Sequence, residues 1–315
     1  MLSTSMRLAT YDRYGPPEVL SVTTGPVPQP RPGEVLVQVR AVSVNGGELA
    51  IRAGRLRPFS GKRFPKRMGI DLVGEVVAPE NSRFAAGDLV WGGLPRRLGS
   101  AAEYVAVPAE RLDHVPAGLD AVQAAALPVG TTAITALRDM AALAPGERLL
   151  VRGATGGVGY IAVQLGKAMG AHVTGLASAN NLDLVTELGA HEAIDYRTPG
   201  DLGSFDVIFD TVGTGLPTFR RLLTRHGRMV AIAFDLDRPV RSLGYIAAHA
   251  MRRGRWVRGF SGNPTASLMA ELGRWVAAGA IRPQVDRVFP LADIAAAHRA
   301  LEHGGVQGKI VVQIA

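Results

Sequence analysis

One segment limits the possible folds more than any other, because it reads as a strand, a glycine-rich turn and a helix in direct succession. The apolar strand at 148–152 enters the turn at Gly153, and a helical pattern then runs over 158–169. Glycines let a phosphate approach the backbone closely, and the start of a helix favours negative charge. The spacing Ala-x-Gly-x-x-Gly predicts a dinucleotide site, with Ala in place of the first glycine, formed by Ala154, Thr155, Gly156, Gly157, Val158 and Gly159.

The surrounding sequence alternates between strand and helix patterns. Strands are predicted at 148–152, 172–177, 192–195, 206–210, 228–233 and 255–260, and helices at 158–169, 182–188, 216–224 and 243–251. This alternation is typical of parallel βαβ units, and six strands complete a doubly wound Rossmann sheet. A glycine-rich turn alone could be an ordinary strand–helix connection, whereas this context favours a dinucleotide-binding domain over residues 123–263.

The flanking regions have a different pattern. Residues 34–40 alternate apolar and polar side chains, as a half-buried strand does, and further short strands are predicted at 72–78 and 88–91. The tail has helix patterns at 268–277 and 291–301 and strand patterns at 285–289 and 309–314. Its residue types resemble those of the first region. We therefore predict an α/β protein whose second domain is discontinuous, β-rich and mostly antiparallel, built from residues 1–122 and 264–315.

Composition excludes several classes of chemistry. The chain has no cysteine, which rules out disulfides, thiolate catalysis, iron–sulfur clusters and sulfur-ligated zinc. No apolar run approaches the roughly 18 residues of a membrane-spanning helix, and residues 1–7 lack the apolar stretch of a secretory signal. We expect a cytoplasmic protein without a membrane partner. An α/β-hydrolase is excluded because residues 259–263 read GFSGN and break the required Gly-x-Ser-x-Gly.

The chain is basic, with a net charge of +8 and an isoelectric point near 10.3. The positive residues are densest at 52–67 and 252–258. They could form a solvated surface, steer an anionic substrate or cofactor, or contact nucleic acid. Nucleic acid is the least favoured reading, because no ladder of aromatic residues interleaves with the arginines as single-strand binding would favour.

The ends of two strands indicate which dinucleotide binds. The second strand ends at Ser178 without the carboxylate that would hold the ribose hydroxyls of NAD. Ser178 could donate to a 2′-phosphate, and the third strand places Tyr196 and Arg197 nearby. These residues favour NADPH, although Ser178 and Arg197 could also be ordinary loop residues.

Several short segments, taken together in their order along the chain, resemble one family. They are 40–45 (RAVSVN), 69–76 (GIDLVGEV), 87–90 (GDLV), 124–128 (AAALP), 156–159 (GGVG) and 308–312 (GKIVV). Over nearly its whole length the chain resembles the medium-chain dehydrogenase/reductase superfamily, and within it the zinc-independent quinone oxidoreductase, or zeta-crystallin-like, branch. The resemblance implies a GroES-like catalytic domain and a hydride transfer from NADPH to a small electrophile, either a quinone or an α,β-unsaturated carbonyl compound.

The resemblance also suggests how the site is built. Zinc-dependent relatives carry Cys and a His-Glu pair where this chain has 44–45 (VN) and 70–71 (ID), so we expect no metal. The family pattern places Asn45 and Thr132 near the nicotinamide. Asn45 could donate to the acceptor oxygen or be a turn residue, and Thr132 could cap a helix. Glu48 could be an acid or a solvated side chain. We also assign to the cofactor site Val212, Ile232, Phe234, Phe260, Ser261 and Lys309.

The chain departs from its relatives at two positions. Asn181 stands where many relatives have a lysine on the 2′-phosphate; we keep Asn181 in the predicted cofactor site but expect weaker selectivity for NADP. Ala50 replaces a tyrosine of the cleft.

The resemblance also leads to two further expectations. The rival hypothesis to a reductase is an NADPH-binding protein with a structural or RNA-binding role. Relatives usually pair nucleotide-domain edge strands, which predicts a homodimer through residues 255–260.

Overall fold

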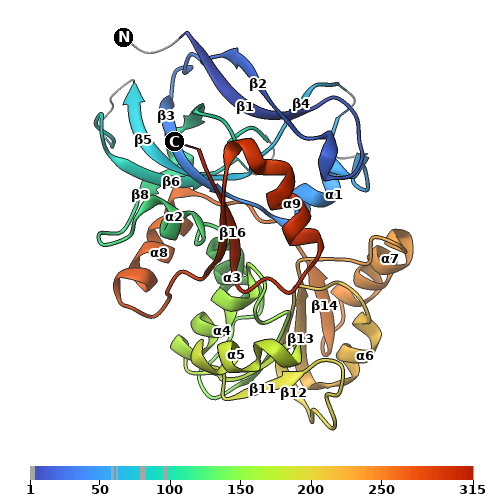
Figure 1. Cartoon of the computed structure of the whole chain (residues 1–315). Coiled ribbons are helices and arrows are strands. Elements are labelled where there is room, and N and C mark those ends of the chain that lie inside the picture. The colour runs from blue at the N-terminus through green and yellow to red at the C-terminus, as the bar shows by residue number, and fades with distance from the viewer. Residues whose placement is uncertain (1–3, 58–59, 62, 79–82, 95–97, 315) are drawn as a thin grey trace. The chain divides into compact units, whose positions relative to one another are not determined.

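The computed structural model describes residues 4–57, 60–61, 63–78, 83–94 and 98–314 (Figure 1). Contacts within the chain define two compact units. The first comprises Met1–Val129, Pro264–Ala277 and Pro283–Ala315, and the second comprises Gly130–Asn263 and Ala278–Arg282. Helix α2 (Ala121–Ala125) belongs to the first unit because it packs on that unit's main sheet.

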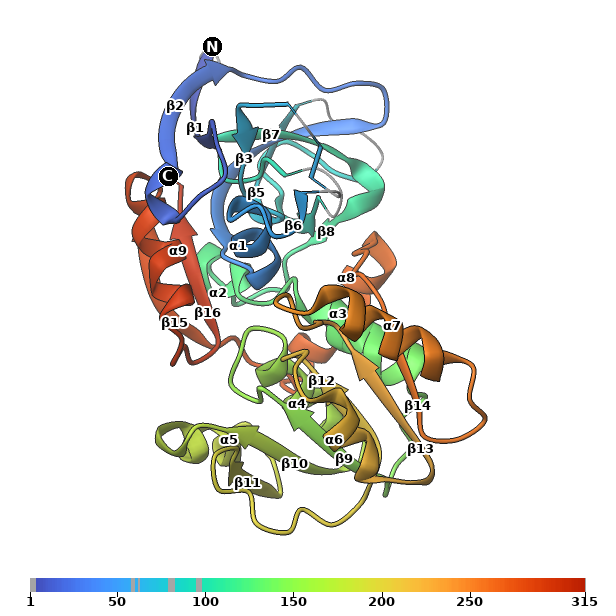
Figure 2. The same cartoon turned by 90° about the vertical axis from the view of Figure 1, so that its right-hand side faces the viewer.

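The second unit contains a sheet of six parallel strands, which confirms the predicted doubly wound fold (Figure 2). The sheet order is β11-β10-β9-β12-β13-β14, so the direction of winding reverses between β9 and β12. Leu149, Leu150 and Val151 are fully buried, as expected for a parallel strand covered on both faces. The strands are β9 (Arg148–Arg152), β10 (His172–Ala177), β11 (Glu192–Asp195), β12 (Phe205–Asp210), β13 (Leu223–Ala231) and β14 (Trp256–Gly259).

Helices connect these strands. Helix α4 packs on β9 and β10, α5 on β10 and β11, α6 on β13, and α7 on β14. The helix predicted at 216–224 is shorter because the chain enters β13 at Leu223. The helices of this unit are α3 (Gly130–Ile134), which continues as a π-helical turn (Thr135–Met140), α4 (Gly159–Ala168), α5 (Leu182–Glu187), α6 (Leu216–Arg221) and α7 (Pro239–Ala250), with a 3-10 turn (Ala179–Asn181) before α5.

Among its described residues, the first unit contains a seven-stranded sheet and a smaller three-stranded one. The larger sheet has the order β15-β16-β3-β5-β6-β8, with β7 also paired to β3, and the smaller has the order β2-β1-β4. Among the described strands of this unit, only the pair β15–β16 is parallel. The strands are β1 (Ser5–Tyr11), β2 (Ser21–Pro26), β3 (Glu34–Ser43), β4 (Lys66–Arg67), β5 (Asp71–Ala78), β6 (Leu89–Gly93), β7 (Tyr104–Pro108), β8 (Leu112–His114), β15 (Val285–Pro290) and β16 (Lys309–Gln313).

The C-terminal segment completes this unit. Strand β16 pairs antiparallel with β3, with Val312 opposite Val42, and helix α9 lies along β16 (Figure 1). Alternate residues of β3, including Val35, Val37 and Val39, are fully buried, because period-two alternation gives a strand one apolar face. The remaining helices are α1 (Gly46–Arg52), α8 (Ala266–Ala277) and α9 (Ile294–Glu302), with 3-10 turns at Pro17–Val19, Ala109–Arg111 and Leu291–Asp293.

Candidate active site

The turn between β9 and α4 has the geometry that the glycine pattern predicts. A Cβ on Gly159 would lie 1.9 Å from the carbonyl oxygen of Gly153, so only glycine lets α4 begin this close to the strand. A Cβ on Gly156 would meet only that same oxygen, at 3.4 Å. Gly156, Gly157 and Val158 are partly exposed, whereas Ala154 and Thr155 are buried. The turn therefore offers an accessible backbone surface that fits a pyrophosphate.

Two turns meet where the sheet changes its direction of winding, which is where doubly wound proteins bind their ligands. Thr211, just after β12, donates from its Oγ1 to the carbonyl oxygen of Arg152 at 2.7 Å. Gly153 has a φ of +72°, and a Cβ there would lie 2.5 Å from the same hydroxyl. Thr211 thus holds the two turns together, and its role was not predicted from the sequence.

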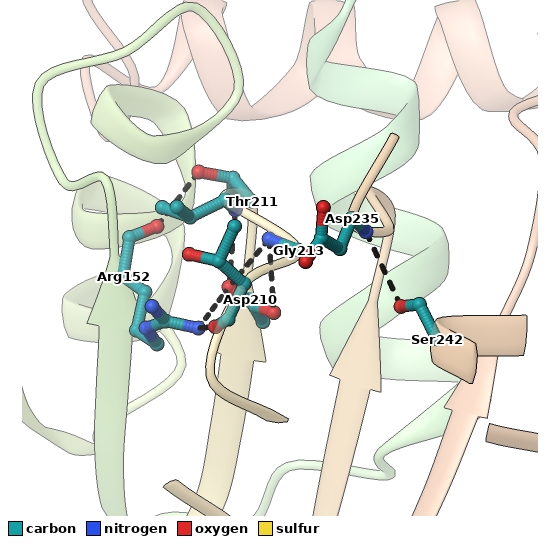
Figure 3. A network of polar contacts seen from close by, with 8 residues as sticks. Arg152, Asp210, Thr211, Gly213, Asp235 and Ser242 are labelled. Atoms are coloured by element: carbon teal, nitrogen blue, oxygen red, sulfur yellow. Dashed lines mark hydrogen bonds and ion pairs between the residues drawn. The ribbon is translucent and has the colours of Figure 1, made fainter. Parts of the chain in front are cut away.

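A buried ion pair supports these turns from below (Figure 3). Arg152 donates from Nη1 to Asp210 Oδ1 and to the carbonyl oxygen of Thr214, both at 2.8 Å. Asp210 also accepts from the backbone nitrogens of Val212 and Gly213. Burial raises the pKa of the Asp210 carboxyl and lowers that of Arg152, and the attraction between the two charges opposes both shifts. The pair fixes the loop that carries Val212.

The sequence contains a signal for this pair, although the pair was not predicted. Arg152 and Asp210 are charged residues at the ends of two otherwise apolar strands. These are the first and fourth strands of the doubly wound order, which lie side by side, and the structure pairs Asp210 with Arg152 in register. Two opposite charges at neighbouring strand ends are therefore predictable once the strand order is assumed.

The residues assigned to the adenosine end gather beside β10 and β11. Ala177 and Asp195 are in register, so Ser178 and Tyr196 follow the same edge of the sheet. Tyr196 is 53% exposed, and the guanidinium of Arg197 lies 4.8 Å from its ring centroid. Asn181 is buried and donates to Thr155 Oγ1 at 3.3 Å, so it links this edge to the phosphate turn.

The remaining predicted cofactor residues of this unit follow its last strands. Ile232 donates from its backbone nitrogen to the carbonyl oxygen of Asp210 at 3.0 Å. A Cβ on Gly213 would lie 2.6 Å from the nitrogen of Phe234, so the turns that carry Val212 and Phe234 are in contact. After β14, Phe260 is half-buried and Ser261 is exposed.

Thr132 lies beside this last loop. It is the third residue of α3 rather than the residue before it, so it does not cap the helix. A Cβ on Gly262 would lie 2.9 Å from Thr132 Oγ1. The structure therefore brings Thr132 next to the segment that contains Phe260 and Ser261.

In the first unit, Asn45 is the centre of a polar cluster. Its Nδ2 donates to Glu48 Oε1 at 2.9 Å and to Asp71 Oδ2 at 3.0 Å, and lies 3.2 Å from the carbonyl oxygen of Ser43. Its Oδ1 accepts from Lys309 Nζ at 2.7 Å. Because both amide hydrogens have partners, a bond to an acceptor oxygen would require one of these contacts to be released.

Glu48 is buried, and the alternative that it is a solvated side chain is wrong. It is 1% exposed, because α1 turns it inward, where it accepts from the backbone nitrogen of Gly69 at 3.1 Å. Burial and the neighbouring Asp71 raise the pKa of Glu48 to about 7, against the opposing effect of Asn45 and Lys309. A carboxyl group with this pKa can hold or release a proton near neutral pH.

Lys309 points into the same cluster. Its Nζ donates to the carbonyl oxygen of Val44 at 3.0 Å as well as to Asn45, and the residue is 3% exposed. Burial lowers its pKa, and the carboxyl groups of Asp71 and Glu48 oppose the shift. A contact between this ammonium and the cofactor would require it to leave these partners.

Among the residues that the structure describes, no three His, Asp or Glu side chains gather as ligands for a metal ion. No helix there has the length and apolar character needed to cross a bilayer.

Comparisons with known proteins agree with this architecture. Residues 31–117 match the alcohol dehydrogenase GroES-like domain, and residues 188–312 match a family described as zinc-binding dehydrogenase. A mitochondrial NAD(P)H oxidoreductase of Mus musculus is 32% identical over 99% of this chain and 90% of its own length. The chain belongs to the medium-chain dehydrogenase/reductase superfamily.

Further relatives place the chain in the quinone oxidoreductase branch of that superfamily. A chloroplast envelope quinone oxidoreductase homolog of Arabidopsis thaliana is 39% identical over 62% of each chain. The solved structure of the quinone oxidoreductase from Coxiella burnetii has a TM-score of 0.87 and 28% identity, and the match covers 99% of this chain and 100% of that one. Since the first two relatives are named for mitochondria and chloroplasts, the cytoplasmic location of this chain stays a prediction.

Proposed function

We propose that this protein is an NADPH-dependent, metal-free reductase that passes a hydride to a quinone or an α,β-unsaturated carbonyl compound. The observation that carries the proposal is the glycine turn at the switch point of the sheet, where Gly156 leaves room for a pyrophosphate. Relatives named as quinone oxidoreductases and a trans-enoyl reductase of Aspergillus terreus support the reaction class. When bound, the reduced nicotinamide supplies the hydride.

The residues of the second unit bind and orient the cofactor. The turn at 153–159 receives the pyrophosphate, and Val212, Phe234, Phe260 and Ser261 form the loops toward the nicotinamide. The absence of a carboxylate after β10 favours NADPH, with Ser178 and Arg197 as donors to the 2′-phosphate. The amide of Asn181 donates to Thr155, and Arg197 is the cation that we assign to that phosphate.

The residues of the first unit manage the proton. Glu48, whose pKa is raised to about 7, holds a proton near neutral pH and can supply it as the acceptor is reduced. Asn45 contacts Glu48 directly and orients that carboxyl group, while Lys309 fixes the amide of Asn45. Thr132 is assigned to positioning of the nicotinamide or the acceptor.

A panel assay tests this function. NADPH oxidation is followed with quinones, enones and enoyl thioesters, with and without a metal chelator. We expect turnover with at least one class and no loss of rate in chelator. A protein that binds NADPH tightly but oxidises it with no member of the panel would instead support the non-enzymatic alternative.

The proposed assembly is a homodimer through the edge strand β14. This strand has a neighbour on only one side of the described sheet, so its other edge can pair with a second copy. Light scattering at micromolar concentration should give twice the chain mass of 33.2 kDa. A monomeric mass would exclude this assembly.

A further inference from the structure

The segment after α1 carries an unusual concentration of positive charge. Between Glu48 and Asp71 the sequence contains no acidic residue, but it contains Arg52, Arg55, Arg57, Lys62, Arg63, Lys66 and Arg67. Arg52 is buried and paired with Glu302, so it serves the interior of the unit. The exposed cations of this segment need a different explanation.

An aromatic ring holds two of these cations together. The guanidinium of Arg57 and the ammonium of Lys66 lie 5.0 and 5.7 Å from the centroid of the Tyr14 ring. The Tyr14 hydroxyl is 2.9 Å from Ser60 Oγ, and the Phe64 ring lies 5.0 Å from the Tyr14 ring, edge to face. Lys66 Nζ also donates to the carbonyl oxygens of Ser60 and Gly61 at 2.7 and 2.9 Å, so ring packing and hydrogen bonds together fix the positions of the two cations.

Among the residues that the structure describes, no carboxylate neutralises this group. In the part of the chain that the structure describes, Arg57, Arg63, Lys66 and Arg67 have no acidic side chain within ion-pair distance, and all except the half-buried Lys66 are exposed. Elsewhere in the same unit, exposed arginines do have such partners, as in the pairs Arg7–Glu103 and Arg299–Glu18. Like charges held on one ring repel each other, and a bound anion removes that repulsion.

The group lies close to the proposed proton donor. The Tyr11 ring is 6.4 Å from the Tyr14 ring and 6.0 Å from the Phe64 ring. Burial raises the pKa of Tyr11 to about 12, and the charges of Arg52 and Glu48 also act on its hydroxyl. Helix α1 joins Asn45 and Glu48 directly to the basic segment. A ligand whose reacting end approached Glu48 could therefore place a charged group on these cations.

We propose that Tyr14, Arg57 and Lys66, together with Arg63 and Arg67, form a basic cluster that binds an anionic group of the acceptor. The group is a phosphate or a carboxylate that lies apart from the carbon or carbonyl that is reduced. This inference rests on the proposed reductase function and names the class of acceptor. Guanidinium groups suit both anions, because their paired N–H donors match the spacing of the oxygens.

Matched pairs of acceptors test the proposal. Crotonyl-CoA is compared with the crotonyl thioester of N-acetylcysteamine, and a 4-oxo-2-enoic acid is compared with its methyl ester. The charged member should have a kcat/KM higher by on the order of tenfold at low salt, mainly through KM. Added salt should reduce the difference. A difference within the CoA pair identifies phosphate as the recognised group, and a difference within the 4-oxo-2-enoic acid pair identifies carboxylate.

Substitutions then locate the effect. Arg57→Gln and Arg63→Gln should remove the preference for the charged acceptor but leave kcat/KM for the neutral acceptors unchanged. Arg57→Lys should retain most of that preference. Arg253→Gln removes an exposed arginine of the second unit and should change nothing. The proposal is overturned if Arg57→Gln lowers kcat/KM equally for charged and neutral acceptors, or if it changes only the KM for NADPH. It is also overturned if the wild type has the same kcat/KM for the charged and the neutral member of each pair.

A binding measurement keeps this proposal separate from the reductase function. Calorimetry with CoA alone should show binding that Arg57→Gln weakens by about tenfold, whether or not any acceptor is turned over. Turnover of neutral acceptors without CoA binding or carboxylate preference would leave the reductase function intact and remove the basic cluster from it. CoA binding without turnover of any acceptor would support the basic cluster as an anion site and remove the reductase function.

Discussion

Burial of His298 on α9 should make the first unit sensitive to acid. The side chain is 1% exposed, neither ring nitrogen has a partner in the described structure, and burial beside Arg52 lowers its pKa from 6.5 to about 3. The unfolded chain therefore binds a proton below pH 6.5 that the folded chain refuses. The resulting stability is complete above pH 6.5 and is lost as the pH falls toward 3, with about 2 kcal/mol lost by pH 5.

The assay compares urea unfolding of the wild type and His298→Leu at pH 7 and pH 5. Leucine cannot titrate and leaves no buried nitrogen without a partner, so the variant should be relatively more stable at pH 5 than at pH 7 by about 2 kcal/mol. His303→Leu, at the exposed end of the same helix, is the control. If wild type and His298→Leu lose the same stability between the two pH values, the reasoning about His298 is wrong.

The remaining predictions concern the two proposed sites. Gly159→Ala places a methyl group 1.9 Å from the oxygen of Gly153 and should weaken NADPH binding at least tenfold by fluorescence titration, whereas Gly244→Ala, in open space, should not. Arg197→Ala should raise the Kd for NADPH by about tenfold without changing that for NADH; equal losses would contradict the assignment to the 2′-phosphate. Wild-type kcat/KM should fall above pH 7 as Glu48 deprotonates, and Glu48→Gln should lower it by about a hundredfold and abolish that decline; an unchanged pH profile would exclude Glu48 as the proton donor.

The local pattern of apolar residues and glycines predicted the strands and the first turn of the second unit well. The apolar strands were identifiable because parallel strands covered on both faces contain long apolar runs, and the glycine turn marks the first of them. Errors occurred at element ends, as where the chain leaves α6 at Arg221 and enters β13 two residues later. No capping residue or glycine marks that boundary, so pattern alone could not place it.

The first unit was harder to predict because its polar cluster depends on distant residues. Lys309 reaches Asn45 only because β16 pairs with β3, and Asp71 reaches Asn45 only because β5 pairs with the same strand. From the sequence, Glu48 could be either an acid or a solvated side chain. Its burial, and hence its raised pKa, follows from tertiary packing, which periodicity cannot reveal.

The most direct test of the proposed reaction is the transfer of deuterium to an enone from NADPH that carries deuterium at both C4 positions of the nicotinamide, with the metal content of the protein measured in the same sample. We expect deuterium on the β-carbon of the product, formed by protein that contains no stoichiometric metal. Unlabelled product, or activity that rises and falls with bound zinc, would contradict it.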